Sequence, residues 1–150
     1  MIWFFVILIV IGLCLYVPIT GGSNKYYKEQ LNNYSLTGNI KIQIGDVTSG
    51  SIFILSNNKE LFHSIPINKK FSYINIKNIL KIELESKYEY KGKQKVVSLT
   101  PQANIVGKEI GVVITIVTED NVYGVFAPMF QKNDAIRLKT ILEKEMKEVE

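Results

Sequence analysis

The hydrophobic and polar positions divide the chain into an apolar N-terminal segment and a longer segment of alternating pattern. Residues 2–19 (IWFFVILIVIGLCLYVPI) carry no charge, and a helix of that length reaches about 27 Å, close to the thickness of a bilayer's hydrocarbon core. Each Leu, Ile, Val or Phe near its centre favours insertion by about 0.3 to 0.6 kcal/mol. Trp3 and Tyr16 suit the two membrane interfaces, and Pro18 falls where the helix ends. The pattern predicts one transmembrane helix within residues 1–20.

Two other interpretations of the apolar segment fit less well. A cleaved signal peptide has basic residues before its apolar core and small residues at the cleavage site, but no Lys or Arg precedes the run and residues 17–22 (VPITGG) match a cleavage site poorly. A lipoprotein would be acylated at Cys14, but Leu13 stands where that motif needs a small residue. We therefore expect an uncleaved anchor.

The residues just after the anchor predict its orientation and a connecting linker. The first basic residues, Lys25, Lys28 and Lys41, all follow the apolar segment, so the positive-inside rule places the domain on the cytoplasmic side of the cell membrane. Residues 21–33 contain Gly-Gly, Ser and Asn without a sustained apolar period, which predicts a short juxtamembrane linker.

Residues 34–150 are predicted to form one mainly β domain. Ile40, Ile42 and Ile44 alternate with polar residues, which is typical of a strand buried on one face. Further β-rich runs cover residues 51–56, 61–67, 73–85, 96–99, 111–118 and 122–127. Turn residues separate these runs, including 57–60 (NNKE), the pair Lys91-Gly92 and 119–121 (EDN). In the run 73–85, Leu80, Ile82 and Leu84 are the expected core face.

A helix is predicted to close the domain. After Pro128 the apolar period becomes helical, with a stripe formed by Ala135, Leu138, Ile141, Leu142 and Met146. Asn133 or Asp134 is the expected N-cap. The predicted architecture is a curled antiparallel sheet, or partly open barrel, of about seven strands capped by one C-terminal α-helix.

This order of elements resembles the pleckstrin-homology-like (PH-like) superfold, in particular bacterial membrane-associated versions that follow transmembrane helices. The resemblance covers about residues 34–147 and rests on strand order and on the segments IPINKKFSYINIKNILKIELE and VITIVTEDNVYGVFAPMFQKNDAIRLKTIL. Phosphoinositide-binding members usually carry several basic residues around the first hairpin loop, whereas the corresponding loop here, GDVTSGS, has none. The aromatic residue often contributed by the closing helix is also replaced, by Leu138 or Leu142. The resemblance therefore implies the fold without the usual head-group site.

Composition and charge narrow the possible functions. The chain has 18 basic and 14 acidic residues, and a net charge of +4 is far from the balance of a nucleic-acid-binding protein. Cys14 is the only cysteine, so neither an intramolecular disulfide nor a thiolate metal cluster can form.

The polar residues suggest no catalytic site, metal site or cofactor. His63, the only histidine, has no acid near it in sequence and is expected to be a packed or surface residue. The three aspartates, at 46, 120 and 134, fall at turn or cap positions. Three glutamates at 83, 85 and 89 share a predicted strand with Lys81 and Lys87, which favours a solvated mixed face over a carboxylate pair. No phosphate-binding glycine loop or nucleophile motif is present, and a non-enzymatic protein is expected.

Residues 87–95 (KYEYKGKQK) form the candidate binding patch. It combines bases with aromatics and comprises Lys87, Tyr88, Tyr90, Lys91, Lys93 and Lys95. Each Lys near an anionic leaflet contributes about 1 kcal/mol, and Lys69 and Lys70 could extend the patch. A plain solvated hairpin explains the same residues. Two main functions remain open: a membrane-tethered module that binds a membrane-associated protein along a strand edge or a helix–sheet groove, and a domain that binds an anionic lipid or small ligand through this patch. A third and weaker alternative is an enzyme whose site is assembled from residues distant in sequence, with His63 beside a buried carboxylate as its sign.

Overall fold

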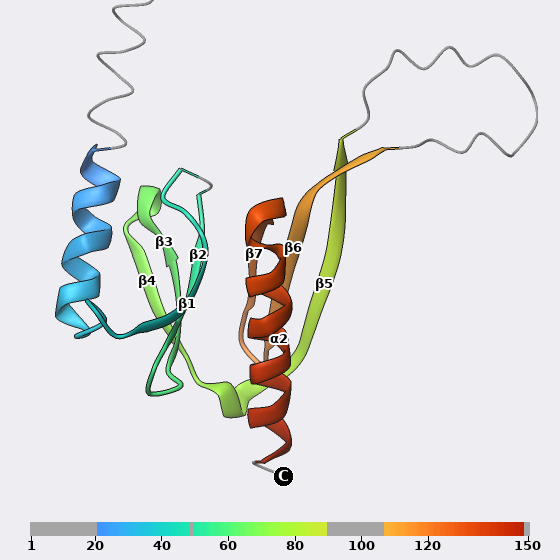
Figure 1. The fold of residues 1–150 in the computed structure, drawn as a ribbon. Helices are drawn as coiled ribbons and strands as arrows, with labels where there is room; N and C mark the ends of the chain where they lie inside the picture. The colour runs from blue at the N-terminus through green and yellow to red at the C-terminus, as the bar shows by residue number, and fades with distance from the viewer. Residues whose placement is uncertain (1–20, 49, 90–106, 149–150) are drawn as a thin grey trace, which may run out of the picture.

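The computed structural model describes residues 21–48, 50–89 and 107–148, and over these ranges the chain is mainly β with a C-terminal helix (Figure 1). The predicted transmembrane segment, residues 2–19, lies outside the described residues. Within the described ranges, none of the helices combines the length and apolarity needed to cross a bilayer.

The first half of the domain is a four-stranded antiparallel sheet, the first sheet. Its strands follow one another as hairpins, in the order β1 (Ile40–Gly45), β2 (Ile52–Ser56), β3 (Leu61–Ile65) and β4 (Lys70–Ile74). The predicted turn at residues 57–60 is confirmed as the β2–β3 connection. Pro66 begins the 3-10 turn η1 (Pro66–Asn68) after β3. Pro66 thus lies beyond a strand end, where its missing N–H breaks no ladder bond.

The second sheet has three antiparallel strands, β5 (Ile79–Glu89), β6 (Lys108–Thr118) and β7 (Val122–Pro128), in sequence order. The predicted hairpin around residues 119–121 is confirmed as β6–β7. The single strand predicted for residues 73–85 is instead two, because the turn η2 (Ile76–Asn78) separates β4 from β5. The Asn75 side chain stabilises this break by accepting a hydrogen bond from the Lys77 N–H at 3.1 Å. The predicted turn at Lys91-Gly92 and strand at 96–99 lie outside the described residues.

The main core lies between the two sheets and helix α2 (Lys132–Lys147), which packs against them (Figure 1). The predicted helical stripe is confirmed: Ala135, Leu138 and Leu142 are fully buried, and Ile141 and Met146 pack beside them. The two sheets share no ladder among the described residues. They are joined by the shared hydrophobic core and by a hydrogen bond that the Ser51 hydroxyl donates to the Gly124 carbonyl at 3.0 Å.

The predicted core face of β5 is partly wrong because the strand contains a bulge. Ile82 is buried and Leu84 is half-buried, as expected, but Leu80 is 61% exposed and Ile79 takes its place in the core. The pairing of β5 with β6 shifts between Ile79 and Lys81. An extra residue in a strand reverses the alternation on one side of the bulge, so Leu80 faces solvent.

The predicted cap of α2 is also wrong. The helix begins at Lys132, directly after the turn η3 (Met129–Gln131), so neither Asn133 nor Asp134 occupies the cap position. Gln131 occupies it and makes no side-chain cap hydrogen bond. Its Oε1 instead accepts a hydrogen bond from the Gly45 backbone N–H at 2.8 Å, which ties the start of α2 to the end of β1.

Residues 21–33, predicted to be a linker, are helical and pack on the outer face of the first sheet. Tyr27 is only 7% exposed, and its hydroxyl donates to Gln43 Oε1 at 3.1 Å. The helix covers a second core formed by Tyr27, Leu36, Ile52, Ile54 and Phe62, with Leu31 beside it. Strand β2 is consequently buried on both faces, which explains its continuous apolar sequence.

Candidate functional site

The only histidine is a packed residue between the two sheets. His63 lies on β3, and its ring contacts those of Phe53 and Tyr123 with centroid distances of 5.2 and 5.1 Å. Burial lowers the pKa of the imidazole to about 4, so the ring is neutral at physiological pH. No described residue hydrogen-bonds its Nε2 atom. The geometry therefore gives His63 neither the acid partner nor the substrate access that a general base needs.

The predicted mixed face of β5 is confirmed. Lys81 Nζ lies 2.6 Å from Glu83 Oε1, and Lys87 Nζ lies 2.9 Å from Glu85 Oε1. These ion pairs are largely exposed, and such pairs contribute little to stability. Among the described residues, no group of three or more His, Cys, Asp or Glu side chains is arranged to hold a metal ion.

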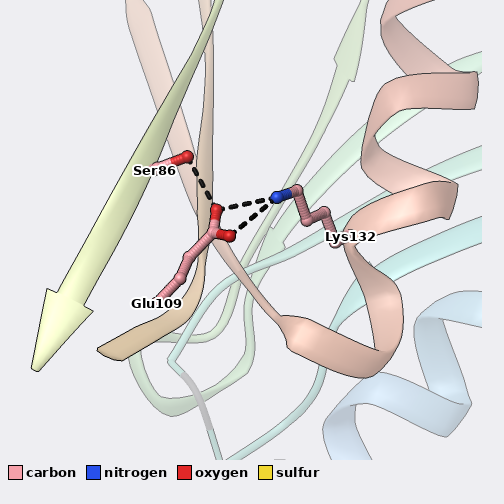
Figure 2. A network of polar contacts seen from close by, with 3 residues as sticks. All are labelled: Ser86, Glu109 and Lys132. Atoms are coloured by element: carbon pink, nitrogen blue, oxygen red, sulfur yellow. Dashed lines mark hydrogen bonds and ion pairs between the residues drawn. The ribbon is translucent and has the colours of Figure 1, made fainter. Parts of the chain in front are cut away.

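A stronger polar network joins the second sheet to α2 (Figure 2). Lys132 Nζ donates to both oxygens of Glu109 at 2.8 Å, and the Ser86 hydroxyl donates to Glu109 Oε1 at 2.7 Å. These hydrogen bonds lower the pKa of the Glu109 carboxyl, with the bond from Lys132 contributing most. The carboxylate accepts three hydrogen bonds from protein donors, so the network ties the start of α2 to β5 and β6.

The structure describes only part of the predicted basic patch. Lys87 and Tyr88 lie near the end of β5, with Lys87 half-buried in its ion pair and Tyr88 exposed. Tyr90, Lys91, Lys93 and Lys95 lie outside the described residues. Lys69 and Lys70, considered as an extension, are exposed where η1 leads into β4, in the other sheet.

The outer edge of β5 is the longest stretch of backbone available for an intermolecular contact in the described part of the chain. β5 has 11 residues and pairs with β6 along one side, and no described strand pairs with its other side. Figure 1 shows β5 at the margin of the second sheet, away from β7. A free edge of this length presents a row of N–H and C=O groups that can pair with another extended chain.

A small polar cavity lies between the β4–β5 connection and the β6–β7 turn. It measures about 150 Å³ and is lined by residues of the β4–β5 connection and of the β6–β7 turn. They include Asn75, Asn78, Thr118, Asp120 and Asn121, flanked by Tyr73 and Tyr123. Its volume is below the range of about 300 to 1,000 Å³ that is usual for ligand pockets.

The sequence pattern does not show which strand edge is free, because alternation within a strand reveals its faces and not which of its neighbours is missing. The available signals were the turn residues at Asn75 and Asn78, which separate β5 from β4, and the length of the run after them. Comparisons with protein-family models, with curated protein sequences and with solved structures found no match to this chain.

Proposed function

We propose that this chain is a non-catalytic, membrane-tethered interaction module with a PH-like fold, and that it binds an extended segment of a membrane-associated protein along the edge of β5. The observation that carries the proposal is that one side of this 11-residue strand pairs with no strand of the described residues. Strand addition is a common mode of peptide recognition, in which main-chain hydrogen bonds supply affinity and pockets for alternate side chains supply specificity.

The side chains of β5 are compatible with a docked strand. The ion pairs Lys81–Glu83 and Lys87–Glu85 form between residues of β5 itself and reach no other element. They can rearrange at little cost because both are solvated. In antiparallel pairing of two copies centred at Leu84, Lys81 would face Lys87 and Glu83 would face Glu85, so this register is disfavoured.

The proposed PH-like assignment is supported by the order of elements. Four strands and then three strands follow in hairpin succession, and a helix at the C-terminus packs into the core between the two sheets. The membrane assignment is supported by the uncharged residues 2–19, which are long enough to span a bilayer as a helix. In the sequence, only Thr20 separates these residues from the described helix of residues 21–33. A partner must then be located at or near the same membrane.

The proposal is tested by photo-crosslinking with the full chain in its native membranes. Benzoylphenylalanine at Glu83 or Glu85 reports on the edge of β5, and the matched control places it at the exposed Arg137 of α2. We expect the β5 positions alone to crosslink to one membrane protein. Addition of that purified protein should then slow amide hydrogen exchange within β5. Equal crosslinking from Arg137, or unchanged exchange in β5, would contradict the proposal.

A further inference from the structure

One end of the domain gathers several of the chain connections, and we call it the loop end. In the first sheet, Gly45 pairs with Ile52, and Ile65 pairs with Lys70, so the β1–β2 and β3–β4 connections lie at the same end. In the second sheet, Glu89 pairs with Lys108, which brings the tips of β5 and β6 together.

Two contacts place these ends of the two sheets beside each other. The Gly45 N–H donates to Gln131 at the end of η3, and Lys132 at the start of α2 is bound to Glu109 near the start of β6. Figure 1 shows the start of α2, the tips of β5 and β6, and the β1–β2 and β3–β4 connections toward one end of the molecule. The loop end therefore comprises η1, η3, the β1–β2 connection and the β5 and β6 tips.

The helix of residues 21–33 also begins at the loop end. Its first turns line a shallow cavity together with Lys69, the residue that follows η1. Only Thr20 separates Gly21 from the last residue of the apolar segment, Ile19. Two peptide units span at most about 7 Å, so the start of this helix cannot lie far from the end of the apolar segment.

The side chains exposed at the loop end suit a lipid surface. Phe130 and Met129 of η3 are 80% and 45% exposed, and Ile67 of η1 is 58% exposed. Lys69 and Lys70 are exposed directly after Ile67 and Asn68. Apolar side chains beside lysines are the combination that binds the headgroup region of an anionic leaflet.

The opposite end carries exposed charges of both signs, including Lys59 of the β2–β3 turn and Lys77 of η2. Exposed Leu80 and Val122 lie there, but the β6–β7 turn beside them carries Glu119 and Asp120. An anionic surface would repel this turn.

We propose that the loop end rests on the membrane, with Phe130, Met129 and Ile67 inserted at headgroup level and Lys69 and Lys70 against anionic lipid. This inference rests on the membrane tether of the proposed function and adds a second contact. In this orientation β5 runs away from the bilayer, and its outer edge faces along the membrane plane, toward other proteins in the same membrane.

Depth-dependent fluorescence quenching tests the inference. The full chain, with Cys14→Ala, carries one fluorophore at Asn68→Cys, Asn133→Cys or, as the control from the opposite end, Glu119→Cys, in vesicles of phosphatidylcholine and phosphatidylglycerol. We expect nitroxide-labelled lipids to quench the probes at positions 68 and 133 and to leave position 119 unquenched. Equal quenching at all three positions, or quenching at position 119 alone, would overturn the inference.

Variants separate insertion from mere proximity. The double substitution Ile67→Ser and Phe130→Ser should reduce quenching at positions 68 and 133 to the level of position 119, whereas Val122→Ser at the opposite end should change nothing. Full quenching in the double variant would contradict the inference, because it would show that the membrane tether alone holds positions 68 and 133 close to the bilayer. Flotation of each chain with the vesicles distinguishes the two proposals. A chain that floats without quenching refutes the loop-end contact and leaves the tether, and one that fails to float refutes both.

Discussion

Lowering the pH should weaken the fold through His63, because its neutral ring is buried against Phe53 and Tyr123. The pKa of the imidazole is about 4 in the folded protein and 6.5 in the unfolded chain. Between these values the unfolded state binds a proton that the folded state does not, so the free energy of unfolding falls as the pH falls from about 6.5 to about 4. At 1.36 kcal/mol per pKa unit, protonation of this single group lowers the free energy of unfolding by about 3 kcal/mol.

The variant His63→Phe isolates this contribution. Phenylalanine keeps a ring between Phe53 and Tyr123 and does not titrate, and every other ionisable group is common to both proteins. Urea unfolding of the detergent-solubilised full chain can be followed by far-UV circular dichroism, since the single tryptophan, Trp3, lies outside the domain. We expect the variant to gain about 3 kcal/mol relative to the unsubstituted protein between pH 7 and pH 4. Parallel pH profiles of the two proteins, or an NMR titration midpoint of His63 near 6.5, would refute the reasoning.

Three further substitutions test the packing of the fold by urea unfolding. Gly111→Ala should destabilise the β6–β7 hairpin and lower the urea midpoint, because a Cβ at this position would collide with the Ala127 carbonyl; an unchanged midpoint would contradict the geometry. Tyr27→Phe should cost about 1 kcal/mol by removing the hydrogen bond to Gln43, and no loss would contradict this hydrogen bond. Glu109→Gln should destabilise the protein at neutral pH, and the difference from the unsubstituted protein should shrink as the pH falls below about 4.5, because the stability that comes from the lowered pKa is complete above the unfolded-chain value and is lost as the carboxylate becomes protonated. A difference that stays constant with pH would contradict this assignment.

The elements that could be predicted from the sequence are those whose pattern depends on local periodicity. The β6–β7 hairpin follows from two β-branched runs around Glu119-Asp120-Asn121, and α2 follows from its buried stripe of Ala135, Leu138 and Leu142. Both patterns are set within about twenty residues of chain, which is the range over which periodicity is informative.

The features that could not be predicted depend on partners distant in sequence. Residues 21–33 show little helical periodicity because Tyr27 and Leu31 suffice to cover the outer face of the first sheet. The exposure of Leu80 depends on a pairing shift against β6, and Gln131 became the cap residue through a contact with β1. The free edge of β5 is likewise a property of the sheet order, which no single segment specifies.

Amide hydrogen exchange in β5 tests the central claim most directly. The full chain in nanodiscs is compared with and without the membrane protein captured at Glu83 or Glu85. If an extended partner segment adds to the free side of the strand, exchange should slow within residues 79–89 and remain unchanged in β7, the opposite edge of the same sheet. Protection that is absent from β5, or that appears equally in β7, would contradict strand addition as the function of this domain.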